Sequence, residues 1–318
     1  DGALASGWLL RNAHRPARIP DVLSESAWTV DRSIEFIREQ GDRPWCLHTS
    51  FIKPHWPYIV SAPYHDMFGR DDAPAPIRSQ AERGDVNPIF KGFQDHPESI
   101  TFSRDEARLN VIPAYMGLVK QMDDHLGRLI AHLEESGRLA DTLIIFTADH
   151  GDYLGDHWQG EKEFMYDQGV RVPMIVVDPS DGAKRGATSN ALVEAVDVVP
   201  TILDVLGISI PSHIIEGRSL RPLLEGETKW SREAAIAELD YAIYPTARKL
   251  GLGAREARMV MVRTDHWKLV HFGKAFPPQM FDLHNDPQEL MDVGGDPGKK
   301  VMRDELYGRL FEWMRERR

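Results

Sequence analysis

An amphipathic helix followed closely by an apolar strand is the feature that most constrains how this chain can fold. From Pro113 to Gly137, apolar side chains recur with the helical period. Apolar runs follow at residues 142–146 and 172–179, each of a length typical of a buried strand. Helices that alternate with such strands indicate a largely parallel sheet with helices on both faces. We therefore predict an α/β fold in which helices sandwich a largely parallel sheet.

Other segments extend this alternation along the first part of the chain. Ser24 or Ser26 is predicted to cap a helix that stops at Gly41, and residues 190–207 are predicted as a further helix. Residues 44–51 are predicted as a short strand, because the prolines that follow them end regular structure. Ligands of such sheets bind beyond the carboxyl ends of the strands, so the residues that follow these strands are candidates for a site.

The pattern changes near residue 230. Residues 258–264 and 266–272 are two short apolar runs, which predict a hairpin, and residues 299–318 predict an amphipathic helix. We therefore predict an α/β catalytic domain over residues 1–230. A smaller α+β subdomain, with an antiparallel hairpin sheet and a terminal helix, is predicted over residues 231–318.

The charge and composition exclude some classes of partner. The formal net charge is −11, and this argues against a nucleic-acid partner because phosphate backbones bind clustered cations. A small anionic substrate is still compatible with it, since a local cationic site can exist on an acidic protein. No window approaches about 18 uninterrupted apolar residues, so no membrane partner is predicted. The single cysteine, Cys46, excludes an intrachain disulfide and favours a reducing compartment, which predicts a cytoplasmic location.

Asp149 and His150 come directly after the predicted strand of residues 142–146. A carboxylate and an imidazole can bind one cation together, and Gly151 lets the backbone turn so that both side chains converge. The alternative is a turn in which the aspartate only hydrogen-bonds its histidine neighbour. A metal site is therefore one of two interpretations of this pair.

Lys162 and His55 also lie where strands end. Lys162 closes a polar loop that contains three glycines, residues 151–162, and a lysine on such a loop can contact an anionic group. A solvated surface lysine is the alternative. His55 lies between two prolines, where it can donate a proton to a leaving group or hydrogen-bond an oxyanion. The alternative is a structural histidine at a strand end.

Several segments, in a fixed order, carry a resemblance to a known family. They are SFIKPHWPYIVSAPYHDMF, GLVKQMDDHLGRLIAHLEESGRLADTLIIFTADHGDYLGDH, AVDVVPTILDVLGI with EGRSLRPLLEG, and WKLVHFGKAFPPQMFDLHNDPQEL. These segments resemble the sulfatase side of the alkaline phosphatase superfamily and cover almost all of the chain. The last one resembles most closely its phosphonate monoester hydrolase and phosphodiesterase branch.

The resemblance implies roles for four residues and a cofactor. Asp149 and His150 match the family's metal ligands. Lys162 matches the lysine that holds the transferring group, and His55 matches the histidine near the leaving-group oxygen. In the family's double displacement, a formylglycine hydrate attacks phosphorus or sulfur on the metal. The implied cofactor is one divalent metal ion, manganese in this branch, with calcium or zinc as alternatives. The implied partner is a small anionic ester, and the implied assembly is a homo-oligomer such as a tetramer.

The family's nucleophile is missing from this sequence. Formylglycine is made from Cys or Ser in a Cys-x-Pro-x-Arg type motif, which the chain does not contain. Cys46 is predicted instead to be a buried hydrophobe in mid-strand. Ser79 to Arg83 matches loosely but lies after His55, whereas the family's nucleophile precedes that histidine. We therefore predict that the chain is the C-terminal two-thirds of the family pattern, with the formylglycine in a missing N-terminal segment and negligible turnover without it.

Two classes of function follow from these observations. One is metal-dependent hydrolysis of phosphonate monoesters and phosphodiesters, with sulfuric esters as the nearby alternative because the two kinds of monoanion present similar tetrahedral oxygens. The other is a truncated, non-catalytic homologue that acts as a structural or interaction module. The polar segment of residues 69–105 is predicted as a surface excursion that contacts the leaving group. Asp152, Asp156 and His157 are predicted to brace the loop that carries Lys162.

Overall fold

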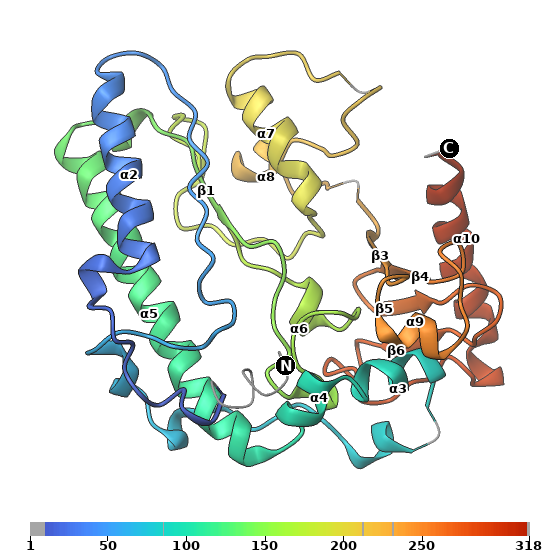
Figure 1. Cartoon of the computed structure of the whole chain (residues 1–318). Coiled ribbons are helices and arrows are strands. Elements are labelled where there is room, and N and C mark those ends of the chain that lie inside the picture. The colour runs from blue at the N-terminus through green and yellow to red at the C-terminus, as the bar shows by residue number, and fades with distance from the viewer. Residues whose placement is uncertain (1–9, 85, 212, 231, 317–318) are drawn as a thin grey trace. The chain divides into compact units, whose positions relative to one another are not determined.

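The computed structural model describes residues 10–84, 86–211, 213–230 and 232–316 (Figure 1). Within these residues the chain forms two compact units. The first consists of the described part of Asp1–Pro76 with Ile100–Thr142, and the second of the described parts of Ile77–Ser99 and Leu143–Arg318. The predicted domain boundary near residue 230 is a different division and stays a prediction.

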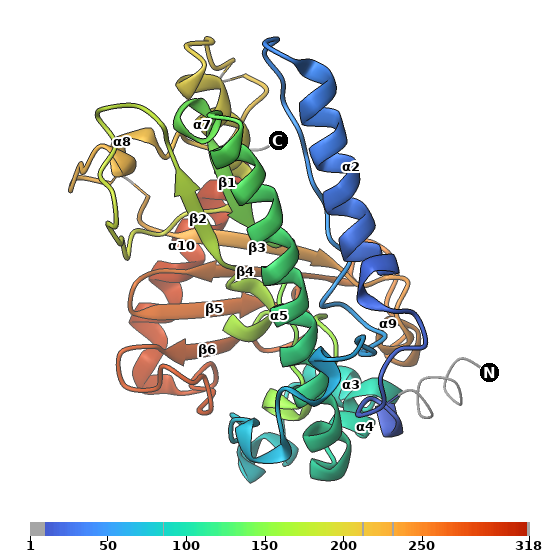
Figure 2. The same ribbon diagram turned by 90° about the vertical axis from the view of Figure 1, so that its left-hand side faces the viewer.

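Two long helices dominate the first unit. α2 (Glu25–Gln40) begins after Ser24, whose Oγ accepts a hydrogen bond from the Ala27 amide at 3.1 Å, so this predicted cap is confirmed. α5 (Asp105–Glu135) packs beside α2 (Figure 1, Figure 2). It begins well before the predicted start at Pro113, since Val111 and Ile112 are buried and their packing outweighs the hydrogen bond that the proline removes.

Residues 44–51 are not a strand, contrary to the prediction. The segment pairs with no other strand among the described residues, and a strand requires backbone hydrogen bonds to a neighbour. Cys46 is exposed, so the prediction of a buried mid-strand cysteine is also wrong. A side chain on an unpaired extended segment has no adjacent strand residues to pack against.

The second unit contains two antiparallel sheets. β1 (Ile144–Thr147) pairs with β2 (Met174–Val177), with Ile144 opposite Val177 and Thr147 opposite Met174. These two strands were predicted to belong to a largely parallel sheet, but their pairing with each other is antiparallel. The connection between them carries one four-residue α-helix, α6 (Asp167–Val170), and a 3-10 turn at Asp156–Trp158, rather than a crossover helix that packs on the sheet.

The other sheet has the order β3-β4-β5-β6. Its strands are β3 (Ala235–Asp240), β4 (Arg258–Arg263), β5 (Trp267–His271) and β6 (Gln279–Asp282). The predicted hairpin is confirmed, because β4 and β5 pair antiparallel around a turn at Thr264 and Asp265. The terminal helix α10 (Lys300–Glu316) covers one face of this sheet through Leu306 and Leu310 (Figure 2).

An aromatic core joins the opposite face of this sheet to the segments that follow β1. Its largest members are Phe90, Tyr153, Phe164, Tyr166, Tyr241, Phe272 and Phe281. These rings pack at edge or tilted angles, for example Phe90 and Tyr166 with centroids 5.5 Å apart. This core fixes the loop after β1 on the C-terminal sheet.

The remaining helices are short. They are α3 (Pro88–Gln94), α4 (Pro97–Phe102), α7 (Val198–Val205), α8 (Arg221–Leu224) and α9 (Pro245–Lys249). The 3-10 helices are Asp21–Leu23, Tyr64–Asp66, Arg70–Asp72, Gln80–Arg83, Leu139–Asp141, Asp156–Trp158, Ala195–Asp197 and Pro297–Lys299. The helix predicted over residues 190–207 is thus limited to α7 and the 3-10 turn before it. Among the described residues, no helix is long and apolar enough to span a membrane.

Candidate active site

Asp149 and His150 converge just beyond the end of β1. The Asp149 Oδ2 and His150 Nε2 atoms are 3.5 Å apart, and Asp149 Oδ1 accepts a hydrogen bond from the His150 amide at 2.9 Å. His150 Nδ1 lies 2.8 Å from the Gly151 carbonyl oxygen, which favours a proton on Nδ1. That tautomer leaves the Nε2 lone pair on the same side as the carboxylate. The Asp149 side chain is 86% exposed, so the pair is accessible from solvent.

Gly151 makes this turn possible. Its amide donates to the Gly169 carbonyl at 2.8 Å, and a Cβ at this position would lie 1.8 Å from the Gln168 carbonyl oxygen. Only a residue without a side chain lets the backbone approach α6 so closely. The sequence prediction of a turn at Gly151 agrees with this geometry.

The loop that follows doubles back and brings Lys162 to the same helix. Tyr153 donates its amide to the Glu161 carbonyl at 2.8 Å, and Gly155 donates to Gln159 at 2.8 Å. A Cβ at Gly169 would lie 3.2 Å from the Lys162 carbonyl oxygen, so the backbone of Lys162 also packs against α6. Lys162 Nζ lies 3.5 Å from Glu161 Oε2, and its side chain is 29% exposed.

The polar residues of the loop attach it to the segment at residues 77–83. Asp156 Oδ1 accepts from the Ile77 amide at 2.9 Å, and the buried His157 donates its own amide to the Ile77 carbonyl at 2.8 Å. His157 Nδ1 lies 2.7 Å from Glu82 Oε1, and its ring stacks on Tyr166 at 3.7 Å. The bracing role predicted for Asp156 and His157 is thus matched by contacts at the loop's far end.

Asp152 braces the loop locally. Its Oδ1 accepts from the Leu154 amide at 3.1 Å, two residues along the chain. Sequence reasoning missed Glu82, the buried partner of His157, because 75 positions separate the two residues. The only local signal is the QAER turn, in which Glu82 Oε2 also accepts from the Ser79 amide at 2.6 Å.

His55 lies in the first compact unit. Its amide donates to Ile52 at 3.0 Å, and its Nδ1 lies 3.0 Å from the Trp56 carbonyl oxygen. Lys53 Nζ donates to the carbonyls of His55 at 3.2 Å and Pro57 at 2.7 Å, which closes this turn. Burial lowers the pKa of Lys53, and the charge of Glu25 opposes that effect. The approach of His55 to the other three predicted residues stays a prediction.

Asp149 and His150 fit two positions of a divalent-metal shell. Two atoms that each bind one cation at about 2.1 Å lie about 3 to 4 Å apart, which matches the separation of these two donors. In the part of the chain that the structure describes, no cluster of three or more His, Cys, Asp or Glu residues is arranged to hold a metal. Asp149 and His150 could therefore supply two of the ligands that such a cation needs, and a metal site here stays a prediction.

No described residue fits the role of the formylglycine precursor. Cys46 is exposed on an extended segment and lacks the motif's proline and arginine. The Ser79 amide is held by Glu82 at the start of a 3-10 turn, which makes this loose match a structural turn.

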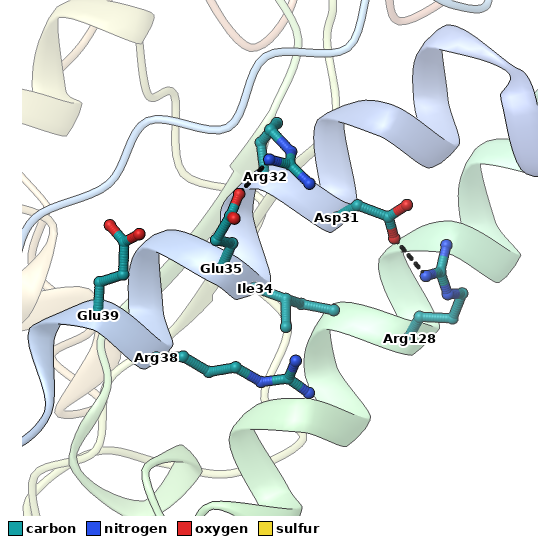
Figure 3. A pocket seen from close by; sticks show the side chains of 7 residues that line it. All are labelled: Asp31, Arg32, Ile34, Glu35, Arg38, Glu39 and Arg128. Carbon is teal, nitrogen blue, oxygen red and sulfur yellow. Dashed lines mark hydrogen bonds and ion pairs between the residues drawn. The ribbon is translucent and has the colours of Figure 1, made fainter.

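A separate hollow on the surface of the first unit is lined by charged residues of opposite sign. It measures about 380 Å³ and is lined by Asp31, Arg32, Ile34, Glu35, Arg38, Glu39 and Arg128 (Figure 3). Arg128 pairs with Asp31 at 2.5 Å, and Arg32 pairs with Glu35. None of the candidate site residues lies in it.

Comparison with known proteins finds family profiles that match most of the chain. The profile described as Sulfatase matches residues 21–208, and the profile described as N-sulphoglucosamine sulphohydrolase, C-terminal, matches residues 155–316. The multifunctional alkaline phosphatase superfamily protein PehA of Trinickia caryophylli is 32% identical over 96% of this chain and 64% of its own length. An arylsulfatase of Clostridium perfringens is 30% identical over 93% of this chain and 60% of its own.

Two solved structures are similar throughout the described fold. The phosphonate monoester hydrolase SpPMH from Silicibacter pomeroyi matches with a TM-score of 0.87 and 32% identity, covering 95% of this chain and 62% of that one. The phosphonate monoester hydrolase of Agrobacterium radiobacter matches with a TM-score of 0.87 and 29% identity, over 95% and 63%. This chain spans less than two thirds of the length of each of these relatives.

Proposed function

The chain belongs to the sulfatase family, and from this premise we propose that the protein hydrolyses phosphonate monoesters and phosphodiesters. The observation that carries the proposal is the match to two phosphonate monoester hydrolases with a TM-score of 0.87 over 95% of this chain. The family's α/β fold with a smaller C-terminal α+β part agrees with the fold predicted from the sequence. The substrate is thus a small anionic ester.

The candidate site supports this function with a positive charge at Lys162 and a proton donor at His55. Lys162 on the returning loop would bind a non-bridging oxygen of the ester as a point charge. His55 would donate a proton to the leaving-group oxygen, which requires a hydrogen-bonding distance in the substrate complex. The attack step is assigned to neither Cys46 nor Ser79, because neither fits the family's nucleophile.

Asp149 and His150 would hold the metal. When bound, a divalent cation supplies positive charge that stabilises the oxygens of the reacting group. We propose manganese, because a carboxylate with one imidazole suits a cation of intermediate hardness. Titration of the metal-free protein with manganese, calcium and zinc tests this choice, and tighter binding of either alternative cation would contradict it.

Sulfatase activity is the second candidate. It is favoured by the 30% identity to an arylsulfatase and by the sulphohydrolase profile over residues 155–316. A non-catalytic interaction module is the third, and the substrate panel separates it from the two hydrolases. A cytoplasmic location also remains a proposal based on the single cysteine, and cell fractionation tests it.

A substrate panel tests these candidates on a form of the protein that carries a formylglycine, because negligible turnover is predicted without it. The panel compares an aryl phosphonate, an aryl phosphodiester and an aryl sulfate ester that share the same aryl leaving group. The first two are expected to react faster. Lys162→Ala is expected to lower kcat/KM by about 100-fold or more, because an electrostatic donor to the reacting group is lost. Lys300→Ala, on the exposed face of α10, serves as the matched control and is expected to match the unmodified protein.

Each outcome separates one candidate from the others. Faster sulfate ester hydrolysis would replace the phosphonate proposal by the sulfatase one. Absence of turnover on all three esters would favour the non-catalytic module. Equal losses in Lys162→Ala and Lys300→Ala would remove Lys162 from the site.

A further inference from the structure

A fully buried lysine lies within the C-terminal sheet. Lys268 is on β5, and its Nζ lies 2.5 Å from Asp167 Oδ1 and 2.5 Å from Glu289 Oε1. The same Nζ donates to the Met165 carbonyl oxygen at 3.1 Å. Glu289 is also buried, and its Oε2 accepts from the Asp167 backbone amide at 2.8 Å. Lys268 thus binds the side chain of Asp167, and Glu289 binds its main-chain amide.

Asp167 is the first residue of α6, and α6 supports the candidate active site from two sides. The Gly169 carbonyl accepts the amide of Gly151, next to the predicted metal pair. The Gly169 Cα lies against the carbonyl of Lys162, where a Cβ would come within 3.2 Å of that oxygen. The turn at Gly151 and the backbone of Lys162 therefore both pack against α6. The buried cluster of Lys268 and Glu289 binds Asp167, the first residue of α6.

The charges in this cluster depend on one another. Burial favours the neutral form of the Asp167 carboxyl, but Lys268 and Arg263 outweigh that effect and lower its pKa. Burial raises the pKa of Glu289, and the charge of Lys268 opposes the shift. Because a buried charge that loses its partner is strongly unfavourable, removing Lys268 would leave the buried Glu289 without its cation, and Asp167 with only the more distant Arg263 and Arg171. The start of α6 would then move or loosen to reach water.

We propose that Lys268 and Glu289 are positioning residues: by fixing the start of α6, they determine where the candidate active-site loop lies. The proposal rests on the proposed function, because the loop matters for catalysis only if it carries the reactive groups. Neither side chain contacts the predicted site residues directly, so both act through Asp167 and α6. The C-terminal sheet, which contributes none of the predicted site residues, thereby becomes part of the catalytic apparatus.

Two variants and a matched control test the proposal on the full protein. Lys268→Met removes the buried cation with little change in shape. Glu289→Gln removes one buried charge but keeps the shape of the side chain and one hydrogen-bond acceptor. Lys300→Met makes the same chemical change in an exposed ion pair of α10. Each protein is first shown to be folded by its urea denaturation midpoint, and kcat and KM are then measured below that midpoint on an aryl phosphonate ester.

Both buried-cluster variants are expected to lower kcat by about 10-fold to 100-fold, as changes in residues that orient a reactive group do. Lys300→Met is expected to keep the kcat of the unmodified protein. The double variant Lys268→Met with Glu289→Gln is expected to lose less than the product of the two single losses, since it leaves fewer uncompensated charges. A purely structural role would lower the denaturation midpoint but leave kcat per folded molecule unchanged, and this result would overturn the proposal.

Hydrogen exchange gives a readout that does not depend on activity. Peptides that cover residues 149–170 are expected to exchange faster in Lys268→Met and Glu289→Gln, whereas peptides of α10 keep their protection. Faster exchange throughout the second unit would indicate general destabilisation and contradict the proposal. If the unmodified protein carries a formylglycine and still hydrolyses no ester, the proposed function fails, and the exchange of residues 149–170 still decides whether these two residues position the loop.

Discussion

Gly151 shows how one residue determines the geometry of the candidate site. It follows Asp149 and His150, donates its amide to Gly169, and leaves no room for a Cβ beside the Gln168 carbonyl. The turn that brings the carboxylate and the imidazole together depends on this close approach of two backbones. A side chain at position 151 would push the pair away from α6.

Gly151→Ala is therefore expected to lower the free energy of unfolding by about 1 to 3 kcal/mol, the usual cost of inserting atoms into a packed site. It is also expected to weaken the proposed manganese binding, since the two proposed ligands move apart. Urea denaturation and metal titration measure the two effects. Gly127→Ala is the control: its Cβ would meet no atom within 4 Å, and alanine is expected to stabilise α5 by about 0.5 to 1 kcal/mol. Equal effects in both variants would contradict the proposed close approach.

Sequence patterns could select the local part of the candidate site but not its long-range contacts. Asp149, His150 and Gly151 are consecutive, and the glycine-rich loop to Lys162 lies in the same stretch, so the sequence pattern was sufficient to select them. Glu82 was not selected, because its partner His157 is 75 positions away and no local pattern relates the two. A glutamate in a polar turn has the same sequence signature whether it is buried or solvated.

The contact between β5 and α10 includes a titratable side chain. His271 ends β5 and is half-buried, and its Nδ1 lies 3.4 Å from the Tyr307 hydroxyl oxygen of α10. Its ring also meets Phe311 edge-on, with centroids 6.3 Å apart. Burial among these rings lowers the pKa of His271. The folded protein therefore favours the neutral form of His271.

This pKa shift predicts how stability depends on pH. The unfolded chain binds a proton at His271 as pH falls below about 6.5, whereas the folded protein binds it only at a lower pH. The contribution of His271 to the free energy of unfolding is thus fully present above that pH and is lost as pH falls towards the folded-state pKa. Denaturation of His271→Gln is expected to depend less on pH across this range.

An exposed histidine in the same unit provides the control for this experiment. His284→Gln makes the same chemical change at a surface position and is measured alongside it. Identical pH profiles for His271→Gln and the unmodified protein would contradict a role for burial at β5.

Elements with a strong local signal were predicted best. The capped helix α2, the hairpin of β4 and β5, and the terminal helix α10 all agree with their patterns, since each pattern is complete within the segment. The segment at residues 44–51 was predicted wrongly as a strand, and the antiparallel pairing of β1 with β2 was not predicted. A strand's neighbour and its direction depend on the path of the intervening chain, which hydrophobic periodicity does not encode.

The chain exposes several large apolar side chains on its second unit. Ile175 on β2, Val199 on α7 and Leu206 just beyond α7 are each more than half exposed. The terminal helix α10 exposes Val301 at 82% and Phe311 at 53%. Where exposed apolar side chains form a contiguous patch, they are typical of surfaces that bind another protein.

The homo-oligomer that the family resemblance implies, for which a tetramer is one possible state, stays a prediction. Sedimentation velocity over a range of concentrations measures the assembly. A species of 36.1 kDa for this chain at all concentrations would contradict the prediction. Val301→Glu places a charge on the exposed face of α10 and is expected to shift the distribution towards smaller species if this helix takes part.

Sequence patterns were enough to identify the family, the main helices and the local stretch that carries Asp149, His150 and Lys162, because helical periodicity, capping residues and consecutive motifs act over a few positions. The tertiary structure alone decided that β1 and β2 run antiparallel, that Cys46 is exposed, and that Lys268 and Glu289 meet at Asp167. The physical reason is that strand pairing and burial are set by contacts between residues far apart in the chain. A lysine in an apolar strand has no local partner in the sequence, and its two carboxylates reach it only when the sheet and α6 have folded together.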